Sequence, residues 1–543
     1  MKTACIGMAM LLLTAGLLAL PPSDYPGQTP VAGDKTVDNV TFIDANRILM
    51  FVTNHGNFGR DLSGFFGYDY GTFFPYSGDT SAIRYGDMIT SPLYAAGLWV
   101  GGKVDGQVRV ALAEYNDEYV PGSMNGDPSG SPRYRVYKIY ADSLESHPSS
   151  DYLQWPIIDG APVDGEGHPR VIGQQTLWSV FNDADPDQHE NDAGMTEPLG
   201  IEVQQTVWAT EYTGPDAPNG SSIYLQYKLY NKSDAVIDSC YVALWSDPDL
   251  GGSGDDLVGC DTLHDLFFCY NADNDDNSYG TTPPAIGFKL LYGPVIPSAN
   301  DTAFFDGALM PGRKNMRMTS FQIYVNGTDP DNYEESFNYM RGLDRDGAPL
   351  ANGTHYAVPG DPVTAMGDLD TAPADRRMMG TCGPFTFNPG DSQYVLIKMA
   401  VGQGTNRLTS ITKLREILNA PPYLGITDFV AVVRPEPQYY FYQNAITPMM
   451  DTIFVGRIGG DPIGDVDLAG LRVNGDIVPT SVGLLPGHAG FLGEVLQIVF
   501  PAKPFIAGYG QLWGTTMQPF AITGGSTSAG QFTVNGTVRM IGH

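Results

Sequence analysis

Basic residues are scarce in this sequence. Its 543 residues include 30 lysines and arginines against 61 aspartates and glutamates, and the formal net charge is −31. A surface with this excess of carboxylates repels the phosphates of nucleic acids and the headgroups of anionic membranes. The composition therefore argues against nucleic acid as a partner. The acids are expected to act either as solvated surface groups or as ligands of bound cations.

Long apolar runs are missing beyond the N-terminus. Near it, Lys2 precedes an apolar run of about 15 residues from Ile6 to Leu20, and Pro21 ends that run. The run is short for a membrane span and typical of the apolar core of a signal peptide. We therefore predict a signal peptide over residues 1–22, an extracellular or cell-surface location, and no membrane span in the mature chain. An uncleaved anchor helix is the alternative.

Cysteine is rare, with 5 in the whole chain. Cys5 belongs to the predicted signal peptide, which leaves Cys240, Cys260, Cys269 and Cys382. An even number of cysteines in an exported chain allows two disulfides, in three connectivities. Buried free thiols are the alternative. The spacing lacks a C-x-x-C pair and does not favour zinc.

Recognised catalytic motifs are missing as well. The 8 histidines are scattered, and the chain contains no H-E-x-x-H, no G-x-S-x-G elbow before a helix and no Walker A loop. These absences argue against zincin proteases, α/β-hydrolases and nucleotide hydrolases. A glycosidase needs only two carboxylates at a set separation, and such a pair cannot be chosen among 61 acids.

Turn-forming and aromatic residues are abundant, with 65 glycines, 41 prolines and 30 tyrosines. This mixture favours short strands joined by loops. Residues 223–230 alternate with a period of two, which predicts a strand with one buried and one solvated face. Asp105 and Gly106 separate two strand-like segments, 98–100 and 108–112, and predict a tight hairpin because both residues tolerate positive φ. We therefore predict an all-β fold.

One segment has helical spacing. Leucine and isoleucine recur at helical intervals, Asn406 or Thr409 can cap the start, and Pro421 stops the helix, which we place over 408–419. The predicted domain order combines this helix with the strand segments. It consists of a signal peptide (1–22), a flexible lead-in (23–37), a large multi-stranded β-sandwich region of one unit or two subdomains (38–420), a junction (421–437) and an immunoglobulin-like β-sandwich (438–543).

Acidic loops carry the most specific chemistry in the sequence. Carboxylates recur at alternate positions around 183–187, and a glycine-rich acidic loop spans 247–261. Ca²⁺ takes six to eight oxygen ligands, and such loops can supply several of them. The first loop is not an EF-hand, because Gln188 and Gly194 stand where glycine and glutamate are required. The alternative is an Asp/Asn turn capped by its own side chains. The predicted calcium ligands are Asp183, Asp185, Asp187, Asp247, Asp249, Asp255, Asp256 and Asp261. A third acidic loop, 273–277, is a weaker candidate.

Several stretches together resemble large secreted bacterial β-sandwich proteins, most of them uncharacterised, that often carry a C-terminal type IX sorting domain or a dockerin. Neither element is recognised in this sequence. The resemblance covers residues 45–420 and implies export and a β-sandwich architecture, without an established activity. The stretches that carry it are 97–102 (GLWVGG), 175–185 (QTLWSVFNDAD), 244–250 (LWSDPDL) with 259–262 (GCDT), 383–385 (GPF) with 388–393 (NPGDSQ), and 402–404 (GQG).

These observations predict a non-enzymatic, calcium-stabilised extracellular β-sandwich protein for adhesion, surface structure or glycan binding. One alternative is a secreted glycan hydrolase, which two carboxylates in an aromatic-lined cleft would favour. Another is a subunit of a surface filament or layer, which an unpaired strand edge would favour. The 6 tryptophans are expected to fill the core rather than to stack on sugars.

Overall fold

The computed structural model describes most of residues 37–424 and shorter segments on either side. The described residues are 31–32, 37–66, 69–80, 83, 90–125, 129–141, 149–164, 167–214, 217, 219–420, 422–424, 433–436, 439–441, 450–455, 468–486, 494–501, 514–526 and 530–542. The predicted signal peptide and most of the lead-in and junction lie outside them. Among the described residues, no helix is long and apolar enough to cross a membrane.

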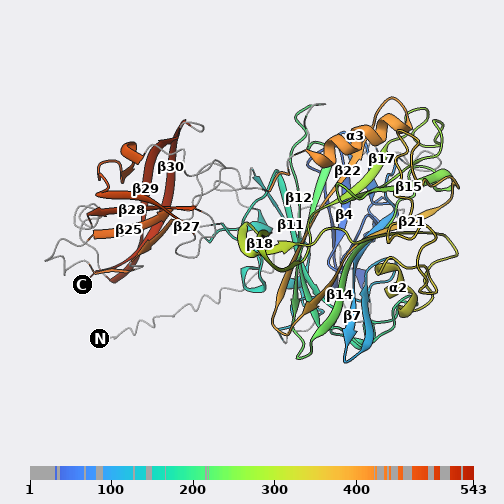
Figure 1. Cartoon of the computed structure of the whole chain (residues 1–543), viewed down its shortest axis with the longest axis horizontal. Coiled ribbons are helices and arrows are strands. Elements are labelled where there is room, and N and C mark those ends of the chain that lie inside the picture. Colours follow the sequence, from blue (N-terminus) through green and yellow to red (C-terminus); the bar gives the residue numbers. More distant parts are fainter. Residues whose placement is uncertain are drawn as a thin grey trace, which may run out of the picture.

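Two nine-stranded antiparallel sheets form the main part of the molecule (Figure 1). We name them after the consecutive strands β13 and β14, one in each sheet. The β13 sheet has the order β10 (Tyr137–Tyr140), β11 (Gln175–Asn182), β12 (Ile201–Ala209), β13 (Ser222–Asn231), β22 (Ser392–Gly402), β17 (Ala285–Tyr292), β16 (Leu266–Asn271) and β15 (Asp256–Asp261), with β9 (Val120–Pro121) beside β11.

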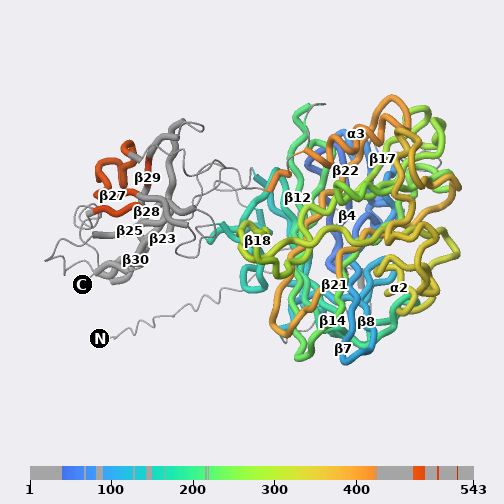
Figure 2. Tube along the Cα trace, viewed as in Figure 1, coloured from blue at the N-terminus to red at the C-terminus, as the bar shows by residue number. Residues whose placement is uncertain are grey.

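The β14 sheet brings together segments that are far apart in the sequence (Figure 2). Its central strands, β7, β14 and β21, come from the first, second and last thirds of the described main region. The order is β20 (Ser320–Val325), β21 (Arg376–Phe387), β14 (Ile237–Asp247), β7 (Ala95–Val104), β5 (Asn57–Phe58), β4 (Leu49–Thr53) and β3 (Val40–Ile43), with β6 (Thr72–Phe73) beside β4 and β8 (Gln107–Leu112) beside β7.

The main core lies between these two sheets, in a sandwich-like arrangement. One continuous cluster of buried side chains includes Val100 and Leu244 from the β14 sheet with Leu225 and Ile397 from the β13 sheet. Burial of this apolar surface is the chief stabilising contribution to the fold. The described main region is therefore mainly β, as the sequence predicts.

The alternating segment 223–230 forms β13, and its inner face packs into the core as expected. Its other face is not solvated, because Tyr224 is fully buried and stacks on Trp208 with ring centroids 5.2 Å apart. The hairpin of β18 (Val295–Phe305) and β19 (Ala308–Asn315) brings Phe304 and Phe305 onto this face. The prediction of a wet face was wrong because a separate hairpin covers the sheet.

The predicted turn and helix are both present. Asp105 and Gly106 take φ values of 52° and 81° between β7 and β8. Helix α3 (Arg407–Asn419) starts at Asn406, whose side chain accepts hydrogen bonds from two backbone N–H groups, and it lies over β22 and β17 (Figure 1). The described residues also contain α1 (Ser150–Leu153) and α2 (Tyr333–Met340), so the prediction of one helix was incomplete. Short 3₁₀ turns are η2 (Pro132–Tyr134), η4 (Ile157–Asp159), η5 (Pro186–Gln188), η6 (Ser253–Asp255) and η8 (Leu468–Gly470).

The C-terminal end of α3 is closed by a buried lysine. The carbonyl of Ile417 would ordinarily accept from the N–H four residues later, but that residue is Pro421, which has no N–H. Lys398 Nζ donates to the Ile417 carbonyl at 2.6 Å instead. The Lys398 side chain is buried, and burial together with the charge of Lys289 lowers its pKa to about 7.

Replacing this lysine should change the pH dependence of stability. The pKa of Lys398 is near 10.5 in the unfolded chain and about 7 in the folded chain, so the folded chain loses this proton at a much lower pH. The stabilising contribution is therefore complete above the unfolded pKa and is lost as the pH falls toward the folded pKa. We expect the melting temperature of the wild type, relative to Lys398→Met, to rise between pH 7 and pH 10.5. Melting curves of both proteins across this range test this, with Lys314→Met on the exposed β19 strand as control. Parallel curves for wild type and Lys398→Met would contradict it.

The four cysteines of the main region are buried and free. The two disulfides that their even number allows are therefore not formed, and the alternative of buried thiols is confirmed. Burial raises the pKa of all four thiols, that of Cys382 to about 12, which makes them poor nucleophiles in the folded state.

Thiol labelling tests this state. Alkylation followed by peptide mapping should modify none of Cys240, Cys260, Cys269 and Cys382 in the native protein. It should modify all four in denaturant without reductant. Peptides that stay unlabelled in denaturant until a reductant is added would instead demonstrate disulfides.

The described strands beyond residue 432 form two four-stranded sheets. One has the order β23 (Val433–Glu436), β25 (Met450–Val455), β28 (Glu494–Pro501) and β27 (Ser481–Pro486), and the other β24 (Tyr439–Phe441), β30 (Gly530–Gly542), β29 (Gly514–Ser526) and β26 (Arg472–Val473). The immunoglobulin-like topology for 438–543 stays a prediction. A small N-terminal pair joins β1 (Val31–Ala32) to β2 (Val37–Asp38).

Candidate functional site

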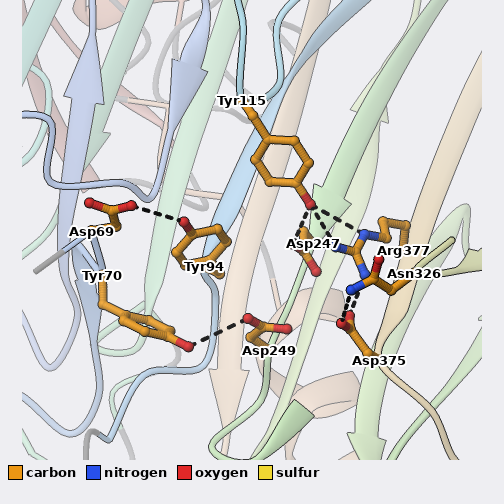
Figure 3. Close-up of a pocket in the computed structure, with 9 residues that line it drawn as sticks. All are labelled: Asp69, Tyr70, Tyr94, Tyr115, Asp247, Asp249, Asn326, Asp375 and Arg377. Atoms are coloured by element: carbon orange, nitrogen blue, oxygen red, sulfur yellow. Dashed lines mark hydrogen bonds and ion pairs between the residues drawn. The ribbon is translucent and has the colours of Figure 1, made fainter. Parts of the chain in front are cut away.

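An acidic pocket lies where β14 ends and β21 begins. The two strands are antiparallel neighbours, with Ser246 opposite Met378. The residues just beyond this pair, Asp247 and Asp249 on one chain segment and Asp375 on the other, therefore come side by side (Figure 3). The pairing of distant strands thus creates a cluster that no single stretch of sequence contains.

Three carboxylates in this pocket can share one cation. One oxygen from each of Asp247, Asp249 and Asp375 lies within 4.8 Å of the others. The Asp247 side chain is only 2% exposed, and its Oδ1 atom has no hydrogen-bond partner in the part of the chain that the structure describes. Asp249 Oδ1 is likewise buried without a partner. Buried carboxylate oxygens are normally satisfied, so these two atoms could accept a hydrogen bond or bind a cation.

Arg377 supplies the only guanidinium among the nine residues that line the pocket. It is 8% exposed and forms ion pairs with Asp247, with Asp375 and, at 3.6 Å, with Asp329. Its Nη2 atom also lies 2.9 Å from the hydroxyl of Tyr115. One cation thus faces three carboxylates. Oδ1 of Asp247 and Oδ1 of Asp249 have no hydrogen-bond partner among the described residues, whereas Asp375 Oδ2 accepts a hydrogen bond from Asn326 at 3.0 Å.

Three tyrosines form one wall of the pocket (Figure 3). Tyr115 donates its hydroxyl to Asp247 Oδ2 at 2.5 Å, and its ring packs edge-on against Trp245. Tyr70 donates to Asp249 Oδ2 at 3.5 Å, and Tyr94 donates to Asp69 Oδ2 at 3.3 Å. The rings of Tyr70 and Tyr94 meet edge to face, 5.0 Å apart. The wall therefore orients the carboxylates with its hydroxyls and leaves half-buried ring surface toward the pocket.

The electrostatics of the cluster favour a cation. Burial, reinforced by the charge of Asp249, raises the pKa of Asp247 to about 8. Burial and the charge of Asp375 raise the pKa of Asp249 to about 6. Both shifts mean that the ionised carboxylates are costly as they stand. A bound divalent cation would remove that cost, because its charge stabilises the ionised form of each ligand.

The pocket is open to solvent and has a volume of about 410 Å³. Its polar side chains offer carboxylate, amide and phenol oxygens, and none of the described residues that line it is a histidine or a cysteine. An all-oxygen set suits the hard cations Ca²⁺, Mg²⁺ and Mn²⁺. Three protein carboxylates leave several coordination positions for water or a ligand oxygen on the open side.

The loop after β14 is held in an unusual backbone conformation. Asp249 has a φ of 45°, and Gly251 a φ of 68°. The Gly251 N–H donates to the Ser91 carbonyl at 2.9 Å, and the Leu250 N–H donates to Asp256 Oδ2 at 3.0 Å. A Cβ atom on Gly251 would lie 2.4 Å from an oxygen of Asp276. The loop therefore requires glycine here to place Asp249 in the pocket.

Gly251→Ala should damage this loop. The left-handed φ costs about 1–3 kcal/mol for a residue with a side chain, and the clash with the Asp276 carboxylate adds to it. We expect lower stability and weaker cation binding, measured by thermal melting and by calorimetric titration with Ca²⁺. Gly254→Ala in the same loop is the control, because a Cβ there meets nothing within 4 Å. Equal behaviour of the two variants would show that the Gly251 conformation is not needed.

In the first predicted acidic loop, carboxylates accept backbone N–H groups, and calcium binding there stays a prediction. Asp183 is buried, and its two carboxylate oxygens accept the N–H groups of Leu199 and Ile201, each at 2.6 Å. Asp185 accepts the N–H of Asp187 and caps a 3₁₀ turn, while Asp187 is exposed. Among the described residues, the acidic group close enough to hold a metal contains none of these three aspartates.

The aspartates of the second predicted loop fall into two groups. Asp247 and Asp249 enter the pocket, as their prediction as ligands requires. Asp256 fixes the backbone of Leu250, and Asp261 accepts the N–H groups of Leu263 and His264 in a turn. Asp255 sits in a 3₁₀ turn outside the pocket. In the weaker third loop, Asp273 and Asp276 likewise accept backbone N–H groups.

Sequence reasoning missed Asp375, Arg377 and the tyrosines Tyr70 and Tyr94. Asp375 stands between an alanine and two arginines and lacks the acidic neighbours that marked the other loops. Its role depends on the pairing of β14 with β21, which is a long-range contact. The acid followed by two bases at 375–377 is a weak signal that a paired charge network begins here.

Comparisons with known proteins assign no family. No protein-family model and no curated protein matches the chain. Among solved structures, a polysaccharide lyase matches 63% of this chain with 9% sequence identity and a TM-score of 0.19. The matched part spans about a third of that lyase, 34% of its length. A likeness at this level assigns neither a family nor an activity, and the chain is best described as a large β-sheet protein with a distant structural match to a polysaccharide lyase.

Proposed function

We propose that this protein is an exported β-sandwich protein whose acidic pocket binds one divalent cation, calcium in its natural setting. Asp247, Asp249 and Asp375 would be the protein ligands. The observation that carries the proposal is that Asp247 and Asp249 each have a buried Oδ1 atom without a hydrogen-bond partner among the described residues. Both residues belong to the group of three carboxylates that offers one oxygen each within 4.8 Å. A bound cation would satisfy both at once.

Calcium is preferred over magnesium for two reasons. Mg²⁺ demands near-octahedral geometry and keeps several waters, whereas Ca²⁺ accepts irregular sets of six to eight oxygens. The carboxylates come from a loop and a strand end, and this arrangement does not impose octahedral geometry on a bound ion. The predicted signal peptide would bring the protein to an extracellular setting, where weak calcium sites of about 10⁻⁴–10⁻³ M are common.

Hydrolysis of glycans by a carboxylate pair finds less support. A general acid must reach the glycosidic oxygen. The Asp247 side chain is 2% exposed, and its Oδ2 atom is held by Tyr115 and Arg377. Release of reducing ends from polysaccharides with chelator present would favour hydrolysis over the cation site.

Terbium luminescence tests the cation site. Tb³⁺ is an oxygen-seeking ion that can replace Ca²⁺, and it emits when an adjacent tyrosine is excited. With Tyr70, Tyr94 and Tyr115 lining the pocket, we expect strong sensitised emission with one ion per chain, displaced by Ca²⁺ and much less readily by Mg²⁺.

Two variants localise the signal. Asp375→Asn should abolish the emission because it removes one of the three carboxylates. Asp273→Asn, in an exposed loop outside the pocket, carries the same charge change and should leave the emission intact. Emission that persists in Asp375→Asn, or that is absent from the wild type, would refute the proposal.

A further inference from the structure

The pocket leaves room for a ligand beside the cation. Three carboxylates bound through one oxygen each give Ca²⁺ fewer than the six to eight oxygens that it takes. The rest must come from the open side, where the cavity of about 410 Å³ is within the usual size range of small-molecule sites. A ligand that offers two neighbouring oxygens would replace two waters at once.

Ring surface and polar groups share this open side. Tyr70, Tyr94 and Tyr115 are each half-buried, and their rings form a continuous wall with centroid distances of 5.0 and 6.2 Å. Asp69 lies at the rim with 64% of its side chain exposed, where its carboxylate can accept hydrogen bonds from hydroxyl groups. A ligand with both a C–H face for the rings and hydroxyls for the cation and rim fits this combination.

The charge balance separates neutral from anionic ligands. Four carboxylates are among the described residues that line the pocket, and Arg377 and the Arg60 that pairs with Asp69 oppose them. One divalent cation offsets the excess of two negative charges and leaves none over. Asp329, which pairs with Arg377 from outside the lining, adds a further negative charge. The site with its cation would therefore be neutral to negative. It would repel an anionic ligand but not a neutral one.

We infer that the pocket binds a neutral carbohydrate, with two adjacent hydroxyls of one sugar residue completing the coordination of the bound cation and the sugar ring lying against the tyrosine wall. The inference rests on the proposed cation site. It adds a ligand class to that site, and it makes carbohydrate binding dependent on calcium. Peptides and uronate-containing polymers are the competing ligand classes.

The test combines two titrations of the full mature chain. Neutral polymers of glucose, galactose, mannose and xylose and the anionic polymer polygalacturonate are titrated in Ca²⁺ and in chelator, and Ca²⁺ alone is titrated separately. We expect at least one neutral polymer to bind in Ca²⁺, loss of that binding in chelator, and no binding of polygalacturonate.

A tyrosine variant distinguishes sugar binding from cation binding. Tyr94 bonds Asp69, so Tyr94→Ala removes ring surface and no carboxylate ligand, and Ca²⁺ is titrated separately into this variant. It should lose affinity for the neutral polymer about tenfold or more, because the wall loses its central ring. Tyr212→Ala, outside the pocket, is the matched control and should bind the polymer normally.

The outcomes distinguish the two proposals. Calcium binding without binding of any neutral polymer overturns the carbohydrate inference and leaves the cation site in place. The same holds if only polygalacturonate binds, or if binding persists in chelator or in Tyr94→Ala. Failure of the calcium titration itself overturns the cation site and, with it, the inference that rests on it.

Discussion

Replacing Arg377 by methionine should destabilise the protein by about 3–5 kcal/mol in chelator, because removing one partner of a buried ion pair leaves the other charge uncompensated. Arg377 is 8% exposed and is the shared partner of Asp247, Asp375 and Asp329. Methionine keeps much of the packing of the alkyl stem and removes the charge. The loss can be measured by urea denaturation.

Calcium should recover part of that loss. The cation would sit beside the same carboxylates and supply the positive charge that Arg377→Met lacks, so the variant should be stabilised by Ca²⁺ at least as much as the wild type. Arg313→Met, on the exposed β19 strand, is the control and should stay within about 0.5 kcal/mol of the wild type. A small loss for Arg377→Met, or a loss that calcium leaves unchanged, would contradict the role given to this network.

The effect of Asp247→Asn on the stability of the protein should have opposite signs in chelator and in calcium. In chelator, asparagine can keep the oxygen that accepts from Tyr115 and Arg377, and its amide can donate toward the unpartnered Oδ1 of Asp249. It also removes a costly buried charge. We therefore expect the variant to equal or exceed the wild type, by about 1 kcal/mol.

In saturating calcium, the wild type should instead be more stable than Asp247→Asn. An ion at a hundredfold excess over its dissociation constant stabilises the folded wild type by about 2.7 kcal/mol, and a variant without the site gains nothing. Melting curves of both proteins in Ca²⁺ and in chelator measure the crossing. Asp255→Asn, in the same loop but outside the pocket, should follow the wild type in both conditions. If Asp247→Asn gained as much from calcium as the wild type, Asp247 would not be a ligand.

Local features of the fold could be predicted because their causes are local. The Asp105–Gly106 turn depends on two adjacent residues that tolerate positive φ. Helix α3 depends on a cap at Asn406 and on the apolar spacing that follows it. Helix α2 was missed because its eight residues present only a short apolar stripe, with Phe337 and Met340 among its buried side chains.

Only part of the candidate site could be predicted from the sequence. Asp247 and Asp249 stand out because they flank a proline in an acidic loop. The pattern around Asp183 looks equally suited to a metal, but the fold places backbone N–H groups of Leu199 and Ile201 against that carboxylate. Which acidic loop faces a pocket and which caps the backbone depends on strand pairing, and that pairing also delivers Asp375. The spacing of residues along the chain contains none of this.

X-ray diffraction from crystals grown with calcium, recorded where calcium scatters anomalously, tests the cation site most directly. We expect one anomalous peak among Asp247, Asp249 and Asp375, about 2.3–2.6 Å from an oxygen of each, and no peak there in crystals grown with chelator. Crystals that contain calcium but show only solvent at this position would contradict the site.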